Sequence, residues 1–221
     1  MTAPTLHAPT TDADLLGIRL AHRSMTTDVR RLTDTTEAIG WGRQACSPRR
    51  ATAIGNYVEL LIESIDHHHH TEDDVLWPVL EAAAGAHVDL DALSDDHTEL
   101  AELLTELQHT SSTFARSATA EDAMTLAHTL ARLGALLDEH LEDEERTIFP
   151  IITRYVDKSD WTAVEESARK RGRLDFDGPR ALGAAEPAEL ERIMAEGGIM
   201  LRILAPVLTR KHRKRERAVF A

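Results

Sequence analysis

The sequence is poor in the residues that build disulfide-rich and metal–sulfur proteins. Its 221 residues include one cysteine, Cys46, which excludes a disulfide framework, a cysteine-rich zinc site and a thiolate-held iron–sulfur cluster. Aromatic residues are also scarce, at 4%. The chain lacks a run of about 18 apolar residues, so we expect no membrane span. The first residues contain no basic segment followed by an apolar run, so we expect no signal peptide and a cytoplasmic protein.

Positive charge is in short supply. The formal net charge is −13, with 25 Lys and Arg against 38 Asp and Glu, which argues against general nucleic-acid binding. Residues 210–217 are the exception, with six basic residues and one acid, or +5, so the rest of the chain carries −18. We expect this basic tail to be a solvated helix end that docks on the acidic bundle. Contact with nucleic acid, an anionic membrane or an acidic partner is the alternative.

Apolar residues make up 42% of the chain and recur with helical periodicity almost throughout. Four long helices are predicted, over residues 12–39, 49–77, 89–115 and about 119–149. Pro78 and Pro150 are expected to close the second and the fourth. Weaker patterns predict a helix over 159–171 and one or two over 187–217. The fold class predicted is all-α, an antiparallel up-down four-helix bundle with a C-terminal helical extension. Its parts are a tail (1–11), the bundle (12–158) and the extension (159–221).

Histidine is abundant, with 12 residues, and some of it is placed regularly. The second and fourth predicted helices match at an offset of 72 residues, which pairs four apolar positions, then His68 with His140 and Glu72 with Glu144. Steps of three and four put these residues on the core-facing side of each helix.

The first and third predicted helices match at an offset of 75, which pairs His22 with His97 at core positions. Neighbouring helices of an up-down bundle run in opposite directions. The histidines early in helices one and three therefore meet the His and Glu residues late in helices two and four. Six buried polar groups would be costly without partners, and two close carboxylates would repel each other. A cation resolves both problems. Four imidazoles and two carboxylates suit a pair of iron, manganese or zinc ions, with positions left open for water or a small molecule.

These residues resemble the hemerythrin-like (HHE cation-binding) family, in its bacterial H-HxxxE-H-HxxxE form. The pattern consists of His22, His68-x-x-x-Glu72, His97 and His140-x-x-x-Glu144, and aromatic–proline pairs follow at Trp77-Pro78 and Phe149-Pro150. The resemblance covers residues 12–155. It implies those six residues as ligands of two iron ions, bridged by carboxylate or an oxo group, with zinc or manganese as lesser candidates. It also implies that the centre meets dioxygen, peroxide or nitric oxide.

Two departures argue against simple reversible oxygen carriage. Oxygen-carrying hemerythrins have a second His one turn after the helix-three His, where this chain has Ala101, and they tend to use HxxxxD on helix four. A more open site suits peroxide turnover, nitric oxide chemistry or redox sensing. Three functions stay open: a di-iron oxidoreductase of small oxidants, a non-catalytic sensor that signals through residues 159–221, and a structural site, with zinc or no metal, that holds the bundle together.

Other polar residues are expected to have lesser roles. Of the run His67–His70, only His68 follows the core pattern, so His69 and His70 are expected to face elsewhere. Tyr57 is expected to be a core residue with a satisfied hydroxyl or, alternatively, an outer donor or extra ligand of the metals. Acidic residues near the pattern are expected to be solvated rather than to support the ligands: Glu63, Asp66 and Glu145. The remaining histidines are expected at the surface: His7, His87, His109, His128 and His212.

Overall fold

The computed structural model describes residues 8–221. Residues 1–7 of the predicted tail, His7 among them, lie outside the described part. Pro9 and Asp157 form an isolated antiparallel bridge, and residues 8–221 contain no strand. The α-helices are α1 Leu16–Gly40, α2 Pro48–Thr71, α3 Trp77–Ala84, α4 Asp91–Ser117, α5 Ala120–Tyr155, α6 Lys158–Arg171, α7 Leu174–Ala184, α8 Pro187–Glu196 and α9 Gly198–Phe220.

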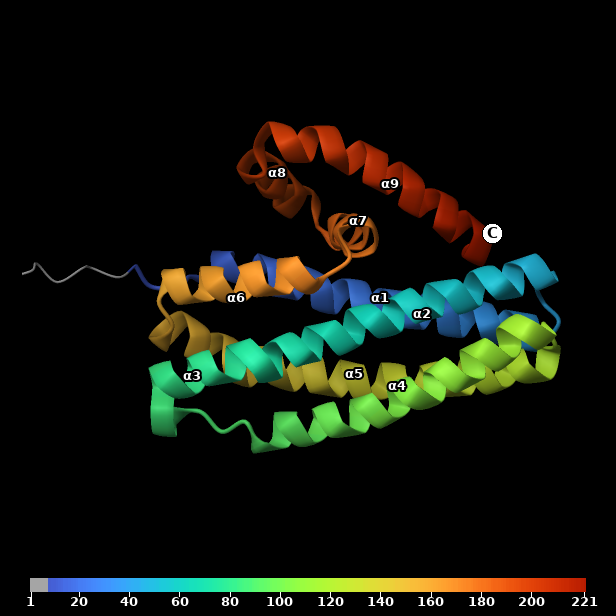
Figure 1. The fold of residues 1–221 in the computed structure, drawn as a ribbon, viewed down its shortest axis with the longest axis horizontal. Coiled ribbons are helices and arrows are strands. Elements are labelled where there is room, and N and C mark those ends of the chain that lie inside the picture. The colour runs from blue at the N-terminus through green and yellow to red at the C-terminus, as the bar shows by residue number, and fades with distance from the viewer. Residues whose placement is uncertain (1–7) are drawn as a thin grey trace, which may run out of the picture.

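Helices α1, α2, α4 and α5 form an antiparallel up-down four-helix bundle, with α6–α9 as a C-terminal extension (Figure 1). Helix α1 packs on α5, α5 on α4, and α4 on α2. Side-chain caps explain two of the starts, because Ser47 accepts a hydrogen bond from the Arg50 amide and Thr119 accepts one from the Asp122 amide. The predicted fold class is confirmed.

The prediction that Pro78 and Pro150 end their helices is wrong. A π-helical turn, Glu72–Leu76, follows α2 and leads directly into α3, so that Pro78 stands in the first turn of α3. Pro150 lies inside α5, which continues to Tyr155. Burial of Phe149 and Ile152 on either side of Pro150 opposes the cost of about 3 kcal/mol that an interior proline carries.

The bundle interior holds two apolar clusters with a polar layer between them. The larger cluster fills the middle and far part of the bundle, from Met25 of α1 to Leu137 of α5. The smaller cluster lies at the other end and includes Leu15, Trp77 and Ile152. The predicted ligand residues lie at the boundary between the segments that supply these two clusters. The polar layer is therefore covered by apolar side chains on both sides along the bundle axis.

The extension folds back over the bundle. Helix α6 packs against α2, α7 against α1, and α9 against α7 and α2 (Figure 1). The sequence did not predict α7, because Gly178 and Pro179 interrupt its pattern; it is held by the fully buried Phe176. Within residues 8–221, the basic tail does not pair with acids of the bundle as expected. Lys211 pairs with Asp175 of α7 at 2.8 Å, and the tail's one acid, Glu216, pairs with Arg31 of α1 at 2.6 Å.

Candidate metal centre

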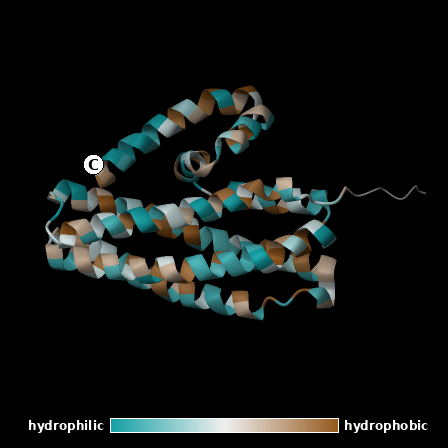
Figure 2. Ribbon diagram, turned by 180° about the vertical axis from the view of Figure 1, so that it is seen from behind, coloured by the Kyte–Doolittle hydropathy of each residue, from teal (hydrophilic) through white to brown (hydrophobic). Residues whose placement is uncertain are grey.

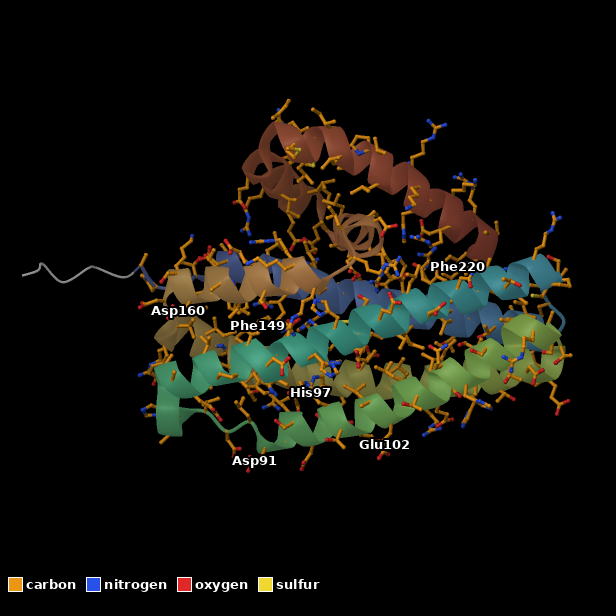
Figure 3. The ribbon with its side chains drawn as sticks, in the orientation of Figure 1. Asp91, His97, Glu102, Phe149, Asp160 and Phe220 are labelled. Carbon is orange, nitrogen blue, oxygen red and sulfur yellow. The ribbon has the colours of Figure 1, made fainter. Side chains whose placement is uncertain are left out.

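The polar layer brings together all six predicted ligand residues. The side chains of Glu144 and His140 are fully buried, and those of His22, Glu72 and His97 are nearly so. His68 is the most accessible of the six, with 13% of its side chain exposed. Figure 3 shows His97 of α4 between α4 and α2, whereas Asp91 and Glu102 of the same helix lie on its outer side.

One group of potential ligand atoms comes from α1, α2, α5 and the π-turn. The Nε2 atoms of His22 and His68 are 3.0 Å apart. Each also lies near a carboxylate oxygen: Nε2 of His68 is 2.9 Å from Glu72 Oε1, and Nε2 of His22 is 3.3 Å from Glu144 Oε2. Two ligands about 2.1 Å from one ion and about 90° apart lie about 3.0 Å from each other. The spacing of this group therefore fits atoms that surround a common metal position.

A second group adjoins the first. It contains His69, Glu72, His97 and His140, each with one ligand atom within 4.8 Å of the others. The Nε2 atoms of His97 and His140 are 3.2 Å apart, and Nε2 of His97 is 3.6 Å from Glu72 Oε2. Glu72 belongs to both groups and turns a different oxygen toward each, so its carboxylate stands where a bridge between two ions would stand.

His69 corrects the expectation that only His68 of the histidine run faces the core. It is 5% exposed, and its ring centroid lies 4.6 Å from that of His97 and 5.1 Å from that of His140. Successive helical residues are about 100° apart, so Glu72 lies about 40° around the helix from His68 and between His68 and His69. Both imidazoles can therefore flank Glu72. His70 is exposed, as expected.

Three of the imidazoles are held by carboxylates on their outer side. Nδ1 of His97 donates to Asp73 at 2.7 Å, Nδ1 of His22 donates to Glu145 at 2.9 Å, and Nδ1 of His140 contacts Asp96 at 3.1 Å. Metal-binding imidazoles commonly donate their second N–H in this way. These contacts fix the tautomer that leaves the Nε2 lone pair facing the centre.

Glu145 was expected to be solvated, and its hydrogen bond to His22 overturns that expectation. Glu63 and Asp66 do lie at the surface, where they pair with Arg173 and His70.

The two aromatic residues of the aromatic–proline pairs cover one imidazole each. The Trp77 ring stacks on His97, with centroids 5.8 Å apart and planes 14° apart, and the Phe149 ring stacks on His22 at 6.0 Å and 24°. Both belong to the smaller apolar cluster. They fix the orientation of the rings and separate this side of the centre from water.

Burial sets the protonation of the potential ligands. It lowers the pKa of His68 to about 3 and that of His140 to about 4, and it takes the pKa of His69 well below its ordinary value. These imidazoles are therefore neutral and able to bind a metal near neutral pH. Burial has the opposite effect on Glu72 and Glu144, because it raises their pKa values well above the ordinary range.

The chemistry of this donor set fits a divalent or trivalent metal. Both nitrogens of His69 and both carboxylate oxygens of Glu72 and Glu144 are buried without a hydrogen-bond partner. Such atoms are costly in a protein interior unless a cation takes the place of the missing partners. Nitrogen and oxygen donors without a thiolate suit iron, manganese or zinc.

Tyr57 is a fully buried core residue whose hydroxyl is satisfied elsewhere. It donates to Asp28 at 2.9 Å. Tyr57 is therefore a core residue with a satisfied hydroxyl and does not contact the candidate metal ligands. Burial raises the pKa of Tyr57 above its usual range, which keeps the phenol protonated. His212 was expected at the surface but is 5% exposed and packs near Tyr57 and Phe176.

Fold and site together define a metal-binding four-helix-bundle protein. The hemerythrin HHE cation-binding domain model matches residues 17–152, more than half of the chain, so the chain belongs to the hemerythrin HHE family. No curated protein and no solved structure gives a significant match. No helix in the described residues is long and apolar enough to cross a membrane.

Proposed function

We propose that the protein is a cytoplasmic non-haem di-iron protein that reacts with a small oxidant such as dioxygen, peroxide or nitric oxide. His22, His68, Glu72 and Glu144 would hold one iron, and His69, His97, His140 and Glu72 the other. The observation that carries the proposal is the shared carboxylate of Glu72, with one oxygen toward each group of imidazoles. When bound, the irons would supply one- and two-electron chemistry.

The residues around the centre suit a reaction with a small molecule. Trp77 and Phe149 exclude water from one side, and the larger apolar cluster closes the other. A surface cleft of about 470 Å³ between α1 and α5 includes His22 in its lining, beside Arg19 and Glu145. This cleft is a route by which a small oxidant would approach the centre.

Metal analysis tests the proposal most directly. We expect protein purified from iron-replete cells to hold about two irons per chain, as dinuclear bundle sites do, and to absorb visible light. Addition of peroxide or nitric oxide should change that absorption and consume the oxidant. Colourless protein with stoichiometric zinc, or protein with no metal, would contradict the iron assignment.

The protons released on metal binding should come from different groups than at a solvent-exposed site of the same residues. At about pH 5.5, a solvated His is largely protonated and a solvated Glu is largely ionised. In the metal-free protein His68 and His140 are neutral at that pH, and Glu72 and Glu144 have pKa values raised well above the ordinary range. We therefore expect protons to leave the two carboxyls rather than the imidazoles.

Calorimetry of metal binding in buffers with different ionisation enthalpies measures this release. Glu144→Gln should reduce it at about pH 5.5. The exposed acidic residue Glu102 lies outside the polar layer, and Glu102→Gln should leave the release unchanged. Unchanged release in both variants would contradict the assignment of the protons to the buried carboxyls.

A second candidate, a sensor that signals through the extension, is favoured by one contact. Arg180 of α7 binds Asp28 of α1 at 2.6 Å and Ser64 of α2 at 2.9 Å. Ser64 lies one turn before His68, so a shift of that ligand would act on the contact between α2 and α7. Absence of oxidant turnover, together with altered hydrogen exchange of α7 on oxidation of the loaded protein, would favour this candidate.

A further inference from the structure

Exposed apolar side chains are concentrated on one helix. Of the eight large apolar residues that are exposed in the described chain, five lie in the first half of α9: Ile199, Met200, Ile203, Leu204 and Val207. Ile199, Ile203 and Val207 are 75%, 62% and 65% exposed, and their spacing of four residues puts them on one face of the helix. A contiguous exposed apolar patch marks an interaction surface.

The same face continues as a row of cations. Arg210, Lys214 and Arg217 follow Val207 at steps of three and four residues, and all three are exposed. No acidic residue occurs between positions 197 and 215. Figure 2 shows the change along α9 from a mainly hydrophobic first half to a hydrophilic second half. We call the residues Ile199, Ile203, Val207, Arg210, Lys214 and Arg217 the outer face of α9.

The opposite face of α9 is already occupied by the protein. Ala205, His212 and Val219 are buried, and the backbone oxygen of Val219 accepts a hydrogen bond from Arg50 of α2 at 2.9 Å. Phe220, at the end of α9, faces the bundle in Figure 3 and lies under the Arg31 guanidinium at 3.9 Å. Helix α9 is thus anchored through one side, and the elbow between α8 and α9 stands away from the bundle (Figure 1).

We propose that the outer face of α9 docks on an anionic phospholipid bilayer. Ile199, Ile203 and Val207 would enter the boundary between headgroups and acyl chains, and Arg210, Lys214 and Arg217 would contact the lipid phosphates. Apolar area and positive charge on one helix face are the two contributions that bind helices to membrane interfaces.

Charge favours a bilayer over a second copy of the chain. The chain outside residues 210–217 carries −18, so an anionic surface would repel the body and attract this face alone. Two copies with their α9 helices parallel would bring equal positive charges together, and two antiparallel copies would place the cations of each helix on the apolar residues of the other. The inference does not rest on the metal centre, because the outer face lies on α9 and the ligand groups lie in the bundle.

Vesicle sedimentation tests the proposal. We expect the full chain to pellet with vesicles of phosphatidylglycerol and phosphatidylcholine, and to stay in solution with phosphatidylcholine alone or at high salt. Each of Arg210→Ala and Lys214→Ala should lower the partition coefficient about fivefold. Ile203→Asp should lower it about tenfold or more, since it removes inserted apolar area and adds a repelled charge.

Matched controls lie on exposed residues away from α9. Arg43→Ala and Arg116→Ala remove cations, and Trp41→Asp removes a side chain that is 67% exposed; all three should pellet like the unchanged protein. Circular dichroism checks that each variant is folded, and Ile203→Trp should give an indole that brominated lipids quench. Equal losses in test and control variants would overturn the proposal, as would absent vesicle binding together with a dimer that Ile203→Asp dissociates.

Discussion

Replacing His69 with alanine is expected to remove metal from the protein, whereas replacing its neighbour His70 is expected to leave the metal content unchanged. His69 is buried against His97 and His140, and neither of its ring nitrogens has a hydrogen-bond partner. His70 is exposed and contacts the backbone of Asp66 at 2.8 Å. The two variants change the same residue type at adjacent positions, so only direction around the helix distinguishes them.

The expected loss of metal affinity is large, because His69 would supply one of the three imidazoles that bind its ion. Removal of an outer hydrogen-bond partner of a ligand costs about 10–100-fold in metal affinity, and loss of the ligand itself should cost more. We expect His69→Ala to bind about one ion per chain and His68→Ala to weaken the other position. Metal titration of the purified variants, followed by elemental analysis, measures both.

Stability of the metal-free protein provides the control. An imidazole that lacks hydrogen bonds in the interior contributes little to the folded state without metal, so His69→Ala should melt near the unchanged protein after metal removal. Full metal content in His69→Ala would assign its imidazole to the core alone and reduce the second group to three residues.

The regular part of this centre could be predicted from the sequence because it follows helix periodicity. Offsets of 72 and 75 residues place His22, His97 and the two HxxxE pairs on core faces without any tertiary information. His69 could not be found in this way, since a periodic pattern selects one row of residues per helix. The two groups of potential ligands draw on two rows of residues at the end of α2, one on each side of Glu72.

The outer carboxylates were missed for a related reason. Asp73, Asp96 and Glu145 each stand next to a predicted ligand in the sequence, about 100° around the helix, where periodicity assigns them to the surface. Their contacts with imidazoles depend on the neighbouring helix. The available signal was an acidic residue next to four of the six predicted ligands: Glu72, His97, His140 and Glu144.

Replacing Arg180 with methionine is the second change with a large expected effect. Within the described residues, the Arg180 side chain of α7 hydrogen-bonds to both α1 and α2, through Asp28 and Ser64. The side chains of Arg180 and Asp28 are 3% and 5% exposed. Removal of one partner from a buried ion pair leaves the other charge uncompensated and costs about 3–5 kcal/mol.

Asp28 also accepts the hydroxyl of Tyr57, so the variant leaves a buried carboxylate with one neutral donor and the more distant Arg31, at 3.6 Å. For a chain of this length, 1 kcal/mol shifts the melting temperature by about 2–4 °C. We therefore expect Arg180→Met to lower the melting temperature by about 6–20 °C in calorimetry.

Arg173→Met is the matched control, because it breaks a pair with Glu63 at 2.9 Å, close to the 2.6 Å of the Arg180–Asp28 pair, but between side chains that are about half exposed. Exposed pairs contribute about 0–1 kcal/mol, so this variant should melt within about 4 °C of the unchanged protein. Since Arg180 joins the two helices that carry His22 and His68, its loss should also weaken metal binding at their position. Equal melting of the two variants would show that α7 is held by the burial of Phe176 and its apolar neighbours rather than by the ion pair.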